Sequence, residues 1–279
     1  MAKHLRKFEN EAAYSAATIY TPSVSLIEDT EAVIFDPAHD YSQDYFTYVA
    51  LGDNLELIWT GDVSGNCLSY STDNGSTWSE PSSSFTVTLA NSGDTIMFKG
   101  SGMKTAPNHP IGRLKPTEFV VDYKVQGNIM SLLFGDNFVN QTDLTGYAGA
   151  FSGFFQFSKT APNTRLLSVE NLVLPATTLA QNCYSTMFNR CTNLTTAPIL
   201  PATTLATECY QNMFKGCSSL NNVTCLATDI TASYCTRDWL NGVNGVVSSG
   251  TFTKAANMND WTTGTSGIPS GWTVVDYTG

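Results

Sequence analysis

A 26-residue repeat in the C-terminal half constrains the fold of this chain more than any other feature of its sequence. The motif Leu-Pro-Ala-Thr-Thr-Leu-Ala starts at Leu174 and again at Leu200, and Cys-Tyr, Met-Phe, Cys and Leu follow each copy at the same spacing. Repeats of roughly 20–29 residues are typical of solenoids, in which each unit buries its apolar side chains only against its neighbours. The repeated apolar positions are therefore the predicted core: Leu174, Leu179, Cys183, Met187, Phe188, Cys191, Leu194, Leu200, Leu205, Cys209, Met213, Phe214, Cys217 and Leu220.

The repeat continues in a weaker form on both sides of these two copies. Downstream, Leu226 and Cys235 keep the spacing of 26, as expected of a terminal copy that exposes a polar outer face. Upstream, residues 151–157 followed by 172–175 predict a degenerate first copy whose spacing is broken by a short insertion. Each copy is expected to contain a short helical turn, which spans 209–214 in the second copy.

The sequence of these repeats resembles the BspA-type leucine-rich repeats of surface proteins from gut and oral Bacteroidetes, and of the bacteriophages that infect them. The resemblance covers about residues 166–240. It implies a right-handed solenoid that presents a surface for host or matrix recognition, and it brings no catalytic residue. The candidate ligand-binding residues are polar and aromatic side chains of the copies: Tyr184, Tyr210, Gln211 and Asn212. The two tyrosines have an alternative role, which is to pack one copy on the next.

Residues 38–103 are predicted to form a small immunoglobulin-like β-sandwich. Five short runs rich in β-branched and aromatic residues alternate there with Gly, Asn, Asp and Ser, which favour turns. The predicted strands are 46–50, 55–59, 67–70, 85–89 and 95–98.

One motif in this region matches the Asp-box pattern S-x-D-x-G-x-T-W of sialidases and other β-propellers: Ser71, Asp73, Gly75, Thr77 and Trp78. Its chemistry is that of a hairpin turn, because Asp73 can accept hydrogen bonds from turn amides and Gly75 can take a positive φ. A propeller needs at least four blades, and a sialidase needs an arginine cluster and a tyrosine nucleophile with an acidic partner. The sequence offers neither, so a glycan-active enzyme is the less favoured alternative.

The segments on either side of the repeats are predicted to cover the two ends of the repeat stack. Residues 104–165 are expected to be a linker and an N-terminal cap, with a loop over 101–118 and strands at 119–125 and 128–134. The C-terminal residues 241–279 contain Trp261 and Trp272, which can cover the open apolar end of the stack. An exposed tryptophan pair could instead stack on sugar rings.

The N-terminal residues 1–37 are predicted to form a helix, at 4–18, followed by a hairpin. The segments 7–14 and 22–29 resemble an N-terminal segment of virion proteins from Bacteroides-infecting phages, including crAss-like phages. The resemblance implies a module that attaches the protein to a capsid, portal or tail. The alternative is a simple cap on the next domain.

Composition excludes several classes of partner. The net charge is −10 and only 14 lysines and arginines are spread over the chain, so no basic face for nucleic acid or anionic membranes is expected. No apolar stretch is long enough to span a bilayer, and the positive N-terminus lacks the apolar run of a secretory signal. Assembly into a virus particle released by lysis is the predicted route out of the cell.

Metals, cofactors and catalysis are not expected. The cysteines lie where a core needs filling, so buried free thiols are predicted, with occasional disulfides as the alternative. Zinc is disfavoured because Cys-x7-Cys lacks the usual short spacing and His4, His39 and His109 are distant in sequence. Calcium ligands at Asp136, Asn140 and Asp143 lack the spacing of a loop site, so solvated turn residues are favoured.

These observations predict a mainly β protein with short helices, built from the N-terminal module, the β-sandwich and a short leucine-rich-repeat solenoid. The predicted function is that of a virion structural protein, a head or tail fibre or decoration subunit on the virion surface. It would display the repeats for adhesion to a host-surface glycan or protein, as a homo-oligomer. The alternative is a surface or secreted BspA-like adhesin of the bacterium itself.

Overall fold

The computed structural model describes residues 40–60, 68–100, 113–118, 120–158, 161–241 and 248–278. Within these ranges the chain is mainly β, as predicted, with one short α-helix. The predicted attachment module at 1–37 lies outside the described residues, and so do Cys67 and the three histidines.

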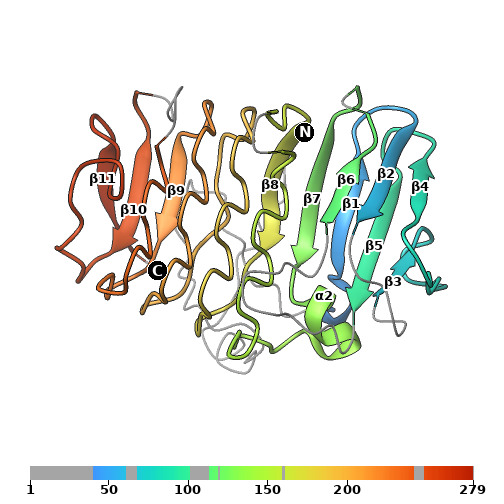
Figure 1. The fold of residues 1–279 in the computed structure, drawn as a ribbon, viewed down its shortest axis with the longest axis horizontal. Coiled ribbons are helices and arrows are strands. Elements are labelled where there is room, and N and C mark those ends of the chain that lie inside the picture. The colour runs from blue at the N-terminus through green and yellow to red at the C-terminus, as the bar shows by residue number, and fades with distance from the viewer. Residues whose placement is uncertain are drawn as a thin grey trace, which may run out of the picture.

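Most elements of the described ranges are short strands, which stand side by side along the long axis of the molecule (Figure 1). They are η1 (Tyr41–Gln43), β1 (Phe46–Ala50), β2 (Leu55–Thr60), β3 (Leu68–Ser71), β4 (Thr86–Leu89), β5 (Thr95–Gly100), β6 (Arg113–Pro116), β7 (Tyr123–Asn128), α2 (Ser131–Phe134), η2 (Gly135–Asn137), β8 (Leu166–Val173), β9 (Asn222–Cys225), β10 (Thr251–Ala255) and β11 (Thr273–Tyr277).

The strands form sheets with the orders β3-β5-β1-β7-β8, β4-β2-β6 and β11-β10-β9. All five residues of β1 are buried, which explains its nearly unbroken apolar sequence. Trp59 of β2 stacks on Phe98 of β5 with ring centroids 6.3 Å apart, so the second sheet packs against the first. The five strands predicted between residues 45 and 100 are confirmed. Their main sheet continues into β7 and β8, however, and is therefore not confined to 38–103.

Two sequence-based predictions around this sheet are wrong. Residues 131–134, predicted as part of a strand, form α2, because the Asn128 side chain accepts a hydrogen bond from the Met130 N–H at 2.9 Å and turns the chain. The predicted loop over 101–118 contains β6, which pairs with β2. Its Pro116 is tolerated because β6 is an end strand, where a missing N–H costs little.

Four chain segments stack on one another in successive layers, and we call them the turn segments: residues 149–156, 182–190, 208–216 and 234–240. Backbone N–H groups of one segment donate to carbonyls of the next, as from Tyr184 to Cys209 at 3.1 Å and from Tyr210 to Cys235 at 2.9 Å. Segments that are 26 residues apart in the sequence therefore lie in adjacent layers, and the weaker third copy also takes part in this stacking. The Phe151 N–H donates to the Cys183 carbonyl at 2.9 Å, so Phe151 occupies in the preceding layer the place that Tyr184 has in its own.

The predicted helical turn at 209–214 is wrong, because the turn segments are runs of tight turns. The N–H groups of Gln211 and Met213 donate to the carbonyl three residues back, whereas those of Tyr210 and Asn212 reach the next segment. An α-helix would instead bond each N–H to the carbonyl four residues back and would keep φ negative at every residue. The alternation is accompanied by a left-handed residue at every fourth position, as at Glu208, Asn212 and Gly216, with φ of 57°, 53° and 80°.

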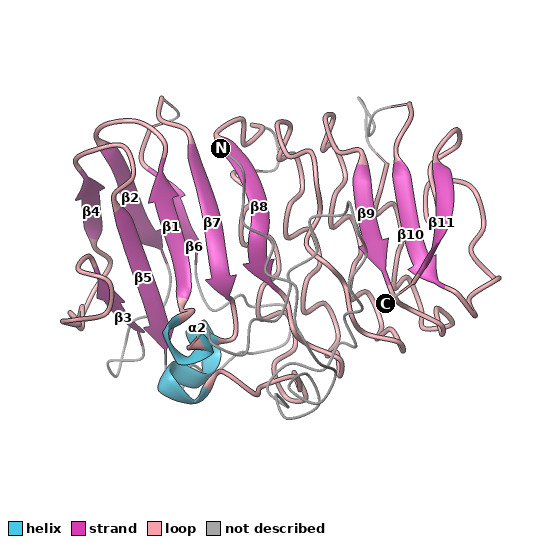
Figure 2. Ribbon diagram, turned by 180° about the vertical axis from the view of Figure 1, so that it is seen from behind, coloured by secondary structure: helices cyan, strands magenta, loops and turns pink. Residues whose placement is uncertain are grey.

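The interior of the stack is lined by the predicted core residues. All of them are buried except Leu179, which is partly buried. Phe188 stacks between Phe155, at 5.1 Å, and Phe214, at 5.5 Å and an interplanar angle of 2°. One hydrophobic core runs from Tyr45 to Trp272 and crosses residues 103 and 165 without a break. The stack and the β1 sheet lie next to each other in both views (Figure 2).

The C-terminal tryptophans cover the end of the stack, as predicted. Trp261 lies parallel to Trp239 with centroids 5.4 Å apart, and Trp272 is only 7% exposed. Beside them, β9, β10 and β11 pair in parallel.

Candidate recognition surface

The two tyrosines predicted to bind a ligand are inside the protein, and this prediction is wrong for both. Tyr184 and Tyr210 are each 1% exposed, and their rings stack with centroids 6.1 Å apart. Burial also raises their pKa values well above the ordinary tyrosine value. They are needed between the layers, because Phe151 fills the same position in the preceding segment and stacks on Tyr184.

The other two predicted residues, Gln211 and Asn212, are half-buried at the outer side of the stack. In the amide orientation that satisfies both groups, the Gln211 oxygen accepts a hydrogen bond from Arg237 Nε at 2.8 Å. Asn212 takes a left-handed conformation with φ 53°, which asparagine tolerates well. The structure therefore brings these residues to the surface next to Arg237 of the following segment.

Tyr234 is the exposed aromatic residue of this surface, and the sequence analysis missed it. Its side chain is 57% exposed, and the Arg237 guanidinium lies 4.3 Å from its ring centroid. Tyr234 occupies the same repeat position as Asn182 and Glu208, and all three have positive φ. An aromatic residue at a position that is polar in the other copies is the signal that could have found it.

Polar pairs connect neighbouring segments along the same side. Gln181 donates to Glu208 at 3.4 Å, and Lys215 pairs with Asp238 at 3.3 Å. Exposed pairs of this kind add little stability, so their main effect is to fix side-chain positions. We define Gln211, Tyr234, Arg237 and Asp238 as the turn ridge. It offers an aromatic ring, a planar cation, an amide and a carboxylate, which are suited to a ligand rich in hydroxyl groups.

The Asp-box is a structural turn, as predicted. Asp73 accepts hydrogen bonds from the Thr77 hydroxyl at 2.6 Å and N–H at 2.9 Å, and from the Ser71 hydroxyl at 2.7 Å. These bonds, that of the Thr77 hydroxyl first, lower the pKa of Asp73 to about 2. The Gly75 N–H donates to the Ser71 hydroxyl at 2.9 Å, and Gly75 takes φ 81°. The Asp73 carboxylate is thus occupied by its own turn.

Trp78 anchors this turn to the body of the protein. Its ring meets the Tyr45 ring edge-on at 4.9 Å, and the Lys99 ammonium lies 4.2 Å from the Trp78 centroid. Lys99 also forms an ion pair with Asp136 at 2.8 Å. The Asp136 carboxylate in turn accepts a hydrogen bond from the Tyr45 hydroxyl at 2.7 Å. Asp136, considered above as a calcium ligand, is therefore committed to an ion pair.

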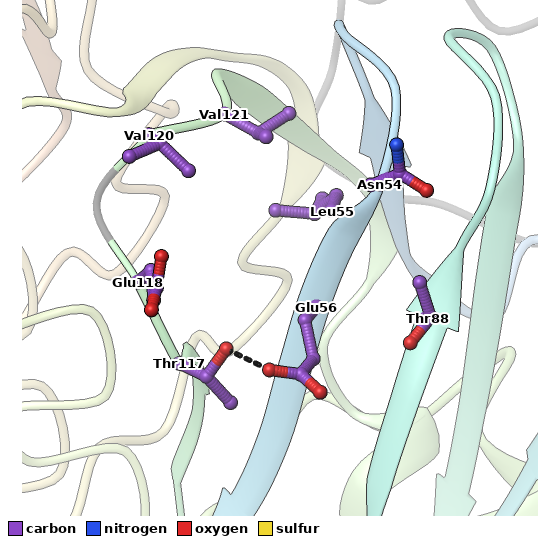
Figure 3. A pocket seen from close by; sticks show the side chains of 8 residues that line it. All are labelled: Asn54, Leu55, Glu56, Thr88, Thr117, Glu118, Val120 and Val121. Carbon is purple, nitrogen blue, oxygen red and sulfur yellow. Dashed lines mark hydrogen bonds between the residues drawn. The ribbon is translucent and has the colours of Figure 1, made fainter.

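A shallow groove of about 240 Å³ lies beside β2 and β4 (Figure 3). Its most exposed apolar residue is Val120, at 68%, and Glu56, which also lines it, accepts a hydrogen bond from the Thr117 hydroxyl. The lining residues are Asn54, Leu55, Glu56, Thr88, Thr117, Glu118, Val120 and Val121.

The described cysteines are free and buried: Cys183, Cys191, Cys209, Cys217, Cys225 and Cys235. Burial raises the pKa of Cys183 and of Cys217 to about 12, so neither is a thiolate at neutral pH. Asp143, also considered above as a calcium ligand, accepts a hydrogen bond from the Thr145 N–H at 2.7 Å. In the part of the chain that the structure describes, no three His, Cys, Asp or Glu residues are grouped to hold a metal, and no helix is long and apolar enough to cross a membrane.

Comparison of the chain with known protein families, with curated proteins and with solved structures finds no match.

Proposed function

We propose that this chain is a non-enzymatic recognition protein, in which a BspA-like leucine-rich-repeat stack carries a surface for a host glycan or protein. The observation that supports the proposal is the turn ridge, where Tyr234, Arg237 and Gln211 meet on adjacent, hydrogen-bonded layers. Side chains that are held in place on the hydrogen-bonded turn segments lose little conformational entropy when a ligand binds.

We further propose that the protein is a virion structural subunit, attached to the particle through its N-terminal residues. The resemblance of residues 7–29 to phage virion proteins and the repeat resemblance support this location. A virion subunit would carry the ridge to the surface of the host cell.

The recognition role is tested by a glycan array and by binding to Bacteroidetes cells. Tyr234→Ala and Arg237→Ala are each expected to weaken binding at least tenfold, because aromatic and arginine residues dominate binding energy. Val120→Ala is the matched control, since Val120 is also exposed but lies in the groove beside β2. Binding that survives both ridge substitutions, or the absence of any binding, would contradict the recognition role.

The location is tested by mass spectrometry and antibody-labelled electron microscopy of purified phage particles. The protein is expected on the particle surface. Detection only in bacterial outer-membrane fractions would reject the virion location and favour the bacterial adhesin.

A further inference from the structure

β11 is the last strand at the C-terminal end of the molecule, and no strand of the described ranges pairs with its outer edge (Figure 1). It is the end strand of the sheet β11-β10-β9, and Val274 and Val275 are 44% and 38% exposed. Phe252 of β10 is the cross-strand partner of Val274, and it is fully buried. An apolar row that is buried in β10 therefore opens to solvent at β11.

The backbone of β11 is suited to pair with one more strand. The Thr273 N–H donates to the Gly250 carbonyl at 2.8 Å, on the β10 side. Because backbone polar groups alternate between the two sides of a strand, Val274 and Asp276 direct theirs toward the free edge. The register between β10 and β11 contains no bulge.

Natural proteins protect sheet edges with lysine, proline, bulges or inward charges. The sequence Thr-Val-Val-Asp-Tyr of β11 contains none of these except Asp276, which forms an ion pair with Lys254 of β10. By contrast, the end strand β3 is paired at Tyr70 with the extended residue Ser79.

We propose that β11 pairs antiparallel with β11 of a second copy of this chain, across a twofold axis at Val275. In an antiparallel pair, residues whose backbone groups point toward the partner strand lie opposite one another, and so do residues whose backbone groups point away from it. This rule allows a twofold axis at residue 274, 275 or 276. An axis at Asp276 sets two carboxylates against each other, and an axis at Val274 leaves Tyr277 outside the paired strand. Only the axis at Val275 pairs all five residues, with Val274 and Asp276 exchanging backbone hydrogen bonds with their counterparts.

The side chains are complementary in this register. Val275 opposes Val275 of the second copy, and Tyr277 opposes Thr273, which are the β-branched and aromatic pairs that stabilise sheets. Asp276 lies opposite Val274 of the second copy, so each carboxylate keeps its own Lys254 and meets no like charge directly. In this register β11 is complementary to itself at every position, which is the reason for proposing a second copy of this chain as the occupant.

The interface is small, so the association is expected to be weak and concentration-dependent. Five paired residues bury less than the roughly 1,200 Å² of a stable interface. Sedimentation of the full chain should show monomers at low micromolar concentration and a growing share of dimers toward ~200 µM, as expected of a contact below the standard interface size.

Cysteine substitutions test the register. Residues 275 of two copies would be opposite, within disulfide range, whereas residues 274 would be diagonal neighbours about 7–8 Å apart. Val275→Cys is therefore expected to give at least tenfold more disulfide-linked dimer under mild oxidation than Val274→Cys, with the unsubstituted chain as the baseline. Equal yields, or more from Val274→Cys, would overturn the register.

Val274→Pro tests the edge itself, because it removes an N–H that points away from β10. It is expected to weaken association at least tenfold while the urea midpoint of unfolding stays that of the unsubstituted chain. Monomers at ~200 µM without cross-linking, or dimers that Val274→Pro leaves intact, would overturn the proposal.

Discussion

The stacked phenylalanines of the turn segments provide the sharpest test of the fold. Phe188 is fully buried between Phe155 and Phe214. Replacing a core phenylalanine with alanine costs about 3–5 kcal/mol, from lost burial and the cavity left behind. Each stacked aromatic pair adds about 0.5–1.5 kcal/mol beyond burial, and Phe188 has two such pairs. We therefore expect Phe188→Ala to lower the free energy of unfolding by about 5 kcal/mol.

Phe188→Leu separates the two contributions. Leucine keeps much of the apolar volume but loses both ring contacts, so it should cost about 1–3 kcal/mol. Val120→Ala, at a position that is 68% exposed, is the control and should change stability by less than about 0.5 kcal/mol.

The assay is urea unfolding, followed by tryptophan fluorescence and far-UV circular dichroism. Coincident transitions would show that the continuous core unfolds as one unit, and linear extrapolation then gives the free energy. A loss below about 1.5 kcal/mol for Phe188→Ala, with an unchanged slope, would refute the reasoning because such a value is typical of a partly exposed side chain.

Three further predictions concern the turns and thiols. Gly127→Ala should destabilise strongly, because Gly127 has φ 81° and a Cβ there would lie 2.1 Å from the Tyr45 carbonyl oxygen; Gly93→Ala, also at positive φ but with nothing within 4 Å, should cost only about 1 kcal/mol in the same unfolding assay. The pKa of Asp73, measured by NMR titration, should be about 2 and should rise toward 3.8 in Thr77→Val. Because folding depresses this pKa, the stabilisation from Asp73 is fully present above pH ~4 and is lost as the pH falls through 2; an unshifted pKa would contradict the turn geometry. Cys183 should resist alkylation at pH 8 until urea unfolds the protein, as peptide mapping can follow, and rapid labelling of the native chain would show that it is not buried.

The repeat spacing predicted which residues are buried, but not how the chain turns between them. Phe188 and Phe214 occupy equivalent positions, so equal spacing alone implies that they stack. The path at 209–214 depends on which N–H groups bond within the segment and which reach the next one. That competition is decided by the neighbouring layer, and a single copy read in isolation favours a helix.

The recognition surface was predicted less well for a related reason. A repeat period identifies equivalent residues but not which of them face outward. Tyr184 and Tyr210 were therefore as plausible at the surface as inside, although they are buried. Tyr234 breaks the pattern at its position, and only the structure shows that Arg237 lies against its ring. Similarly, the apolar run of α2 fits a strand or a helix until the Asn128 turn is seen.

The two ends of the stack differ in a way that bears on both proposals. A repeat array needs a cover at each end. At the first end Phe154 meets Phe46 of β1 edge-on, with centroids 5.5 Å apart, so the β1 sheet is the cover. At the other end the cover finishes in β11, whose Val274 remains 44% exposed. Pairing through β11 would extend the molecule along the stacking axis, because β11 is the last strand of its sheet at that end.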